Sequence, residues 1–491
     1  MVVKESSRYS GPSFLTLHFI FPFTSLDSFF SNSSRRISQH ITDIVSGNSS
    51  NRTKNHSMPP TPNPSEIKPS EMTIEIEGGH QLIIRPNRVV RGHVVLITMA
   101  RIYASQIRIK FRAEETATVK VRESGLDTKI DRIDQMTTTY FEIDSKIWGS
   151  ETSAFSLNPW QVIEPGEHRY PFAMKFPNVN YPPSMDDLPG FSIRYIWSAH
   201  LDAPSFHPGL RSKPHVLPYR PILCAPPPEE WTFSDIIYKD KRSASARVNA
   251  WFPKQVYCPD EAVSLTVDIE CLPSDLVVTG VNFTLRKHHE GKLLLQKGTA
   301  HRSSVRIISQ APAVVPGNSG SVRVPIHFQI PTRLVSPSFA SKHLRVYYDL
   351  VFQIQFENPG SILKSTHTAD LVVPIGIANL PHDHLLRIPD LTAVVSYENS
   401  KEAPMFFDPS LTEPPAQSGI PSELWGPLTA ALATPPTASP PNYFSIPCLP
   451  PQLMRKERVE RIVFTSRLVK PGFSPELGEP IVLTDVKDEE W

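Results

Sequence analysis

The sequence has few cysteines and no excess of charge of either sign. Four cysteines in 491 residues provide no disulfide framework, which is typical of a protein from a reducing compartment. The 50 basic and 49 acidic side chains leave a formal net charge of +1. A nucleic-acid-binding protein needs a basic excess to neutralise phosphates. These two absences disfavour disulfide-stapled secreted modules and nucleic-acid-binding proteins.

Long apolar runs are also missing. The stretch that imitates a secretory signal, Phe14–Phe30, is interrupted by His18 and Pro22 and is too short to span a bilayer, which takes about 20 residues. No small-residue cleavage site follows it, so we do not interpret it as a signal. Residues 31–70 are rich in Ser, Asn, Arg and Pro and offer little to bury. We therefore expect residues 1–71 to be a disordered N-terminal extension.

Proline, by contrast, is abundant. The 51 prolines disfavour a mostly helical protein, because proline breaks helices. From about Met72 the sequence instead shows the period of half-buried strands. Ile107, Ile109 and Phe111 alternate with polar residues, and Leu344–Phe356 shows the clearest alternation. Short alternating strands separated by turns indicate antiparallel β-sandwiches.

These patterns divide the chain into segments. The run Pro226–Pro228 favours a stiff extended connector, and strands resume after it. We expect an all-β protein of two tandem antiparallel, immunoglobulin-like β-sandwiches, over 72–230 and 245–390, with an interdomain linker at 231–244. Beyond residue 390 the alternation fades, so 391–491 is expected to be a proline-rich disordered tail.

The tail carries a PPxY sequence at Pro440, Pro441 and Tyr443. The two prolines favour a polyproline II turn whose rings pack into the aromatic groove of a WW domain at low entropic cost. Tyr443 lies at the offset that places its ring in a neighbouring pocket, and Asn442 is a spacer. The sequence therefore predicts a WW-domain-binding motif in this tail.

The region after the motif has two interpretations. Four basic residues between Leu453 and Phe464 would form, on a short helix, a surface for acidic lipid and hence peripheral membrane association. A solvated helix or plain tail is the simpler interpretation.

Three serines are candidate phosphorylation sites. Ser38 follows two arginines, and Ser243 and Ser245 follow Lys241 and Arg242, which is the arrangement that a basophilic kinase accepts. We expect all three serines to be exposed, so that a phosphate would lie beside basic groups.

No catalytic constellation is present in the sequence. It contains no Gly-rich phosphate loop, no Cys-x-x-Cys, no His-Glu-x-x-His and no Gly-x-Ser-x-Gly. The sequence His382-Asp383-His384 lacks a third ligand element, and His288-His289 is expected at the end of a strand. We therefore predict a non-catalytic protein without a metal or other cofactor.

Several segments together resemble the arrestin family. Glu164–Pro177 and Pro182–Ser184 are similar to the later strands of an arrestin N-terminal domain, with a Pro-Gly turn before a Phe-x-Phe-x-x-Pro strand. Val256–Asp268, His327–Pro331 and Leu344–Phe356 are similar to an arrestin C-terminal domain. Another pair of immunoglobulin-like or fibronectin-like modules is the alternative. The buried charged cluster with which sensory arrestins detect phosphate has no identifiable counterpart, so that function is not implied.

The resemblance, combined with the PPxY sequence, points to the α-arrestin branch, the arrestin-related trafficking adaptors. It implies an adaptor that links membrane-protein cargo, a plasma-membrane transporter or receptor, to a WW-domain HECT ubiquitin ligase and promotes ubiquitination and endocytosis of the cargo. The implied location is the cytoplasm, with recruitment to the plasma membrane or endosomes. Two alternatives are an arrestin-fold trafficking scaffold of the retromer-subunit type, which recruits no ligase, and a secreted β-sandwich binding module.

Overall fold

The computed structural model describes residues 70–122, 130–149, 160–203, 209–240, 243–317, 320–360, 365–388, 391, 393–414, 460–470 and 472–484. Within these residues the chain is built almost wholly of strands, with one short α-helix, α1 (Asp383–Arg387). The strands form two tandem β-sandwiches, so the expected all-β class is confirmed. We refer to residues 70–217 as the N-terminal half and to residues 231–380 as the C-terminal half.

The N-terminal half contains two antiparallel sheets. The first consists, in spatial order, of β1 (Glu71–Ile76), β2 (Val89–Thr98), β7 (Gly166–Lys175) and β24 (Met405–Phe407). The second consists of β11 (Leu210–Arg211), β10 (Phe191–Asp202), β4 (Gln106–Arg122), β5 (Asp131–Gly149) and β25 (Arg461–Val469), with β9 (Met185–Leu188) and β12 (His215–Leu217) also paired to β10. Two short pairs join β3 (Ile102–Ala104) to β6 (Gln161–Ile163) and β8 (Val179–Asn180) to β23 (Val395–Ser396).

The core of this half follows from the alternation in its strands. In β4, Ile107, Ile109 and Phe111 are fully buried while the residues between them face outward. The ring of Phe111 stacks on Trp197 of β10 at 4.2 Å between centroids. Trp197 in turn lies 5.5 Å from Phe172 of β7, in the facing sheet. Aromatic rings from both sheets therefore close this sandwich.

The C-terminal half repeats the arrangement. Its first sheet contains β13 (Trp231–Tyr238), β14 (Ala244–Phe252), β16 (Ala262–Cys271) and β19 (Ser321–Gln329). The second contains β15 (Val256–Tyr257), β22 (Ser365–Ile377), β21 (Leu344–Asn358), β17 (Val277–Leu295) and β18 (Gly298–Ala313), with β20 (Phe339–Ala340) paired to β21. Phe283 of β17 lies 4.9 Å from Phe328 of β19, so the two sheets pack face to face.

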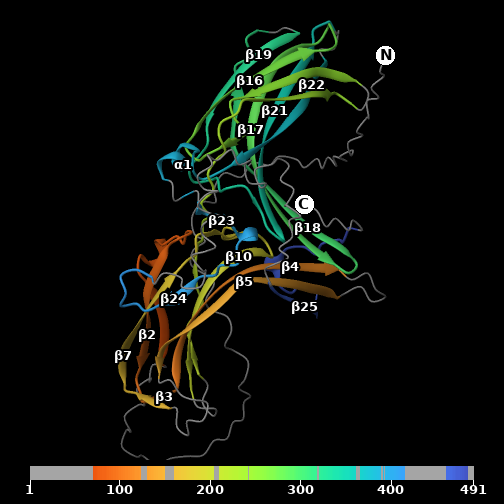
Figure 1. Cartoon of the computed structure of the whole chain (residues 1–491). Helices are drawn as coiled ribbons and strands as arrows, with labels where there is room; N and C mark the ends of the chain where they lie inside the picture. Colours follow the sequence, from red (N-terminus) through yellow and green to blue (C-terminus); the bar gives the residue numbers. More distant parts are fainter. Residues whose placement is uncertain are drawn as a thin grey trace, which may run out of the picture. The chain divides into compact units, whose positions relative to one another are not determined.

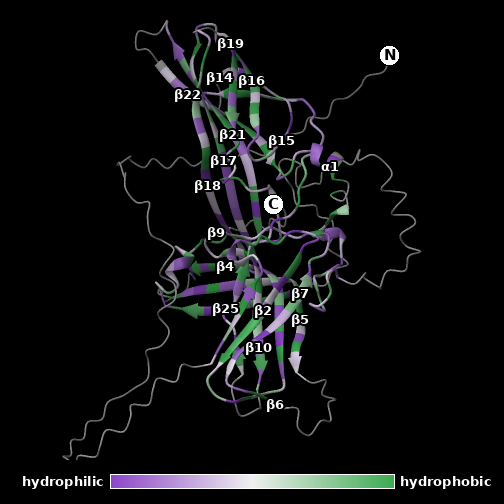
Figure 2. Cartoon of the chain, turned by 90° about the vertical axis from the view of Figure 1, so that its left-hand side faces the viewer, coloured by the Kyte–Doolittle hydropathy of each residue, from purple (hydrophilic) through white to green (hydrophobic). Residues whose placement is uncertain are grey.

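The strand pattern appears directly in the hydropathy of the ribbon. Apolar and polar residues alternate along many strands in Figure 2, as a half-buried sheet requires. The clearest expected strand, Leu344–Phe356, is β21, in which Leu344, Leu350 and Phe352 are fully buried.

Two segments differ from the expectation. Residues 231–238 of the expected linker form β13, which pairs with β14 over eight residues.

In the expected disordered tail, β23, β24 and β25 pair with strands of the N-terminal half. The helical interpretation of Leu453–Phe464 is wrong for residues 461–464, which belong to β25; residues 453–459 lie outside the described residues. These tail segments form backbone hydrogen bonds with sheet edges. Because every residue type except proline can form such bonds, the sequence carries no clear signal for this pairing.

Candidate functional site

Most of the predicted site residues lie outside the part of the chain that the structure describes. Ser38 precedes it, and Pro440, Pro441 and Tyr443 fall between residues 415 and 459. Their roles in phosphorylation and in WW-domain binding stay predictions. The structure does describe the residues on both sides of the PPxY segment.

The other two predicted serines occupy different environments. Ser243 is exposed, and its hydroxyl and amide both donate to the carboxylate of Asp240 in a tight turn. Ser245 is only 2% exposed and its hydroxyl lies 2.9 Å from Nε2 of His367. The expected exposure is therefore wrong for Ser245, which occupies an irregularity in the pairing of β14 with β13. Ser243 stays a candidate for modification.

The segment before the PPxY sequence is fixed to the N-terminal half. Phe407 of β24 pairs with Ala173 of β7, and the guanidinium of Arg91 lies 5.5 Å from the centre of the Phe407 ring. The same guanidinium donates to the carbonyls of Pro409 (2.9 Å) and Leu411 (2.6 Å). Arg91 thus holds the chain as far as Thr412.

The segment after the PPxY sequence returns to the same half. We call the described residues from 460 to 484 the C-terminal strap. Its strand β25 pairs antiparallel with nine residues of β5, Asp131–Thr139, and lies beside it in Figure 1. Its side chains are almost all exposed. Backbone hydrogen bonds and a 2.6 Å bond from Ser466 to the buried Asp134 therefore carry this attachment.

The rest of the strap connects the two halves. The amide of Ile481 donates to the carbonyl of Lys120 in β4 (2.7 Å). Thr484 and Thr299 of β18 exchange two backbone hydrogen bonds of 3.0 Å. Arg302 of β18 donates to the carbonyl of Leu477 in the strap (2.5 Å) and to that of Pro189 in the N-terminal half (3.1 Å). The strap thus bonds to the N-terminal sheet and to a C-terminal hairpin.

A buried carboxylate joins the halves directly. Glu115 of β4 has no exposed surface. It accepts hydrogen bonds from the Tyr140 hydroxyl (2.5 Å), the Ser341 hydroxyl (2.7 Å) and the His343 amide (2.7 Å). Ser341 and His343 belong to the C-terminal half, next to β20 and β21. A buried carboxylate needs such donors because desolvation destabilises its charge.

This cluster continues to the strap through aromatic rings. Tyr140 packs edge-on against Tyr397, with 5.1 Å between ring centroids. The hydroxyl of Tyr397 donates to the carboxylate of Glu460, the first described residue of the strap. Tyr397 is itself in the 3₁₀ turn Tyr397–Asn399 and also contacts Tyr181. Glu460 is therefore held next to the contact between the two halves.

The histidine pair lies within β17 and not at the end of a strand. His288 and His289 face opposite sides of the sheet. His288 and Arg286 both bond to Asp349 of β21. Burial alone would raise the pKa of Asp349, but these two hydrogen bonds outweigh it and lower the pKa. Burial lowers the pKa of His289 to about 4, assisted by the charge of Lys287 and against the opposing charge of Asp187.

The described residues offer neither a metal-binding cluster nor a membrane-spanning helix. No group of three or more His, Cys, Asp or Glu side chains in this part of the chain is placed to hold a metal ion. No helix within it is long and apolar enough to cross a membrane.

The fold defines a protein of two tandem β-sandwiches. Comparison with protein families identifies the class more closely. Residues 72–217 match the model of the arrestin (or S-antigen) N-terminal domain, and residues 242–381 match that of the arrestin (or S-antigen) C-terminal domain. Together the two matches cover more than half of the chain, which is therefore an arrestin-like protein. Among curated proteins, none matches it.

Proposed function

We propose that this arrestin-like chain is an α-arrestin adaptor that links membrane-protein cargo to a WW-domain HECT ubiquitin ligase. The main support for this proposal is the combination of both arrestin domains with the PPxY sequence at Pro440, Pro441 and Tyr443. The domain matches end at residue 381, well before the motif, so the two observations are independent.

The attachment of the chain on both sides of the motif supports this role. Arg91 and β24 hold the chain before residue 415, while Tyr397 and β25 hold it from Glu460 onward. Tyr443 is 17 residues from Glu460, so its reach from that point is at most about 60 Å. A ligase bound there stays close to the sandwiches, and its effective concentration near bound cargo rises without new chemistry.

The arrangement suits an adaptor in a further way. The strands on either side of the PPxY sequence pair with the N-terminal half, on β7 and β5, and the later part of the strap bonds to β18 of the C-terminal half. Cargo is proposed to be a plasma-membrane transporter or receptor, with the chain recruited from the cytoplasm to the plasma membrane or endosomes.

Co-purification from cells tests the proposal. The full chain should recover a WW-domain HECT ligase and carry ubiquitin, and Tyr443→Ala should lose both while its thermal stability is unchanged. Asn442→Ala is the matched control, because it alters the neighbouring spacer, and should behave as the unmodified chain. Recovery of coat or retromer-type components in place of a ligase would instead support the scaffold interpretation.

A further inference from the structure

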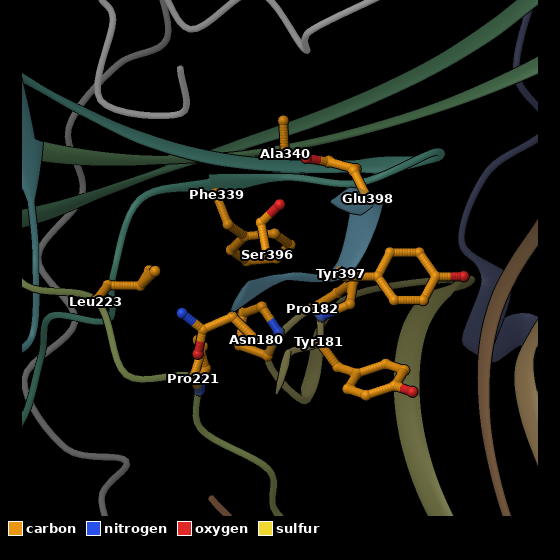
Figure 3. A pocket seen from close by; sticks show the side chains of 11 residues that line it. Asn180, Tyr181, Pro182, Pro221, Leu223, Phe339, Ala340, Ser396, Tyr397 and Glu398 are labelled. Carbon is orange, nitrogen blue, oxygen red and sulfur yellow. The ribbon is translucent and has the colours of Figure 1, made fainter. Parts of the chain in front are cut away.

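A small apolar pocket lies where the two halves meet the segment that follows them. Its volume is about 50 Å³. Tyr181 and Pro182 line it from the N-terminal half, Phe339 from β20, and Ser396 and Tyr397 from the segment after the C-terminal half. In Figure 3, Phe339, Ser396 and Pro182 lie around one space, and the rings of Tyr181 and Tyr397 point away from it. The pocket has room for a single small ring or branched apolar side chain.

The wall of this pocket is apolar and includes one aromatic ring, that of Phe339, beside Pro182. Polyproline II segments dock on aromatic rings, because their fixed turns lose little entropy on binding. Here Phe339, 8% exposed, supplies the ring, while Tyr181 and Tyr397 line the pocket with their own rings packed against Phe141 and Tyr140. Such side chains are already fixed before any ligand arrives.

One polar atom in the wall lacks a partner. The hydroxyl oxygen of Ser396 is buried and forms no hydrogen bond among the residues that the structure describes. A polyproline II chain has no internal hydrogen bonds and therefore presents free carbonyl oxygens. The Ser396 hydroxyl is thus able to donate to a docked chain of that kind, which would relieve the cost of its burial.

The chain carries a ligand of this chemistry within reach. Residues 440–451, PPNYFSIPCLPP, contain five of its prolines. The segment ends nine residues before Glu460. Nine extended residues reach up to about 30 Å. Glu460 is bonded to Tyr397, which is itself part of the pocket wall. Tethering at the pocket gives the segment an effective concentration on the order of millimolar.

We propose that the pocket formed by Tyr181, Phe339, Ser396 and Tyr397 binds a proline or a neighbouring apolar side chain of residues 440–451 of the same chain. This segment includes the PPxY sequence, so docking competes with WW-domain binding. The competition rests on the proposed function, whereas the docking itself does not.

Native Cys448 allows a direct test by disulfide trapping in the full-length chain. Ala340, which lines the pocket, is replaced by Cys in a chain that also carries Cys224→Ser, because Cys224 lies next to the pocket residue Leu223. Asn399→Cys in the same background is the matched control. Asn399 is exposed and two residues from Tyr397, so it shares the tether but is not part of the pocket wall. Diamide oxidises the two thiols, and peptide mass spectrometry measures the rate of disulfide formation with Cys448.

Docking predicts that Ala340→Cys forms the disulfide at least tenfold faster than Asn399→Cys. Ser396→Leu, which fills the pocket, should reduce the Ala340→Cys rate to that of the control. Equal rates for Ala340→Cys and Asn399→Cys in correctly folded chains would overturn the proposal.

A separate titration measures the consequence for ligase binding. If nine-tenths of the chains are docked, a WW domain binds the full chain tenfold more weakly than the free peptide 435–451, and Ser396→Leu restores the affinity of the peptide. Faster trapping of Ala340→Cys without any WW binding would support the docking and reject the proposed function. Equal trapping rates together with WW binding would reject the docking and support the proposed function.

Discussion

Replacement of Glu115 by glutamine is expected to weaken the contact between the halves. One carboxylate oxygen accepts from Tyr140 and the other from Ser341 and the His343 amide. Glutamine retains one acceptor oxygen and places an NH₂ group, which only donates, against the remaining donors. A hydrogen bond to a charged group contributes about 1.5–3 kcal/mol, and an unsatisfied buried group costs a similar amount. We expect Glu115→Gln to destabilise the chain by about 2–3 kcal/mol.

Thermal unfolding of the full chain measures this effect. For domains of this size, a loss of that order lowers the midpoint by roughly 4–10 °C. Glu114→Gln is the matched control, since Glu114 neighbours Glu115 on the opposite face of β4, where its side chain is partly exposed and paired with Arg112. A partly exposed ion pair contributes at most about 1 kcal/mol.

A double-mutant cycle assigns the loss to the contact between the halves. Ser341→Ala should cost less in the Glu115→Gln chain than in the unmodified chain, because the shared hydrogen bond is already disturbed. A midpoint shift for Glu115→Gln no larger than that for Glu114→Gln, or additive effects of Glu115→Gln and Ser341→Ala, would contradict this role of Glu115.

Three further outcomes are expected. First, the pKa of His289 is lower in the folded chain, at about 4, than the ordinary 6.5. The resulting stability is complete above about pH 6.5 and is lost as the pH falls towards 4. About 3 kcal/mol is involved, and His289→Gln should flatten the measured dependence of unfolding free energy on pH over that window. Second, Ser245→Asp buries a carboxylate where only 2% of the residue is exposed and should destabilise the chain by at least about 2 kcal/mol, whereas Ser243→Asp in the exposed turn should change denaturant midpoints little. Third, Arg302→Ala removes the hydrogen bonds to the strap and should speed hydrogen exchange in residues 472–484; unchanged exchange there would show that other contacts hold the strap.

The two sandwiches could be predicted from the sequence because burial on one face gives their strands a hydrophobic period of two. In β21, buried Leu344, Val346 and Tyr348 alternate with more accessible residues, and the order of apolar and polar residues alone reveals this signal. Strand β25 has no such signal in the sequence. Its residues are exposed on both faces, so no burial pattern marks it, and its pairing with β5 uses backbone groups that every sequence has.

In the candidate site, too, only part could be predicted from the sequence. The PPxY sequence is recognisable because its chemistry is local to four residues. The contact of Glu115 with Ser341 and His343 joins residues more than two hundred positions apart, and alternation marks position 115 only as inward-facing. The exposure expected for Ser245 is wrong for another reason: an irregularity in the pairing of β14 with β13, which the alternation does not reveal, places it against His367.

The central claim, that the chain recruits a ligase through its PPxY sequence, is tested most directly by titrating the full chain against WW domains of HECT ligases. Truncation of a buried aromatic anchor commonly costs at least about 2 kcal/mol, so Tyr443→Ala should weaken binding roughly thirtyfold or more. Pro441→Ala should weaken it in the same direction, and Asn442→Ala should bind as the unmodified chain does. Equal affinity of the unmodified chain and Tyr443→Ala would contradict the account.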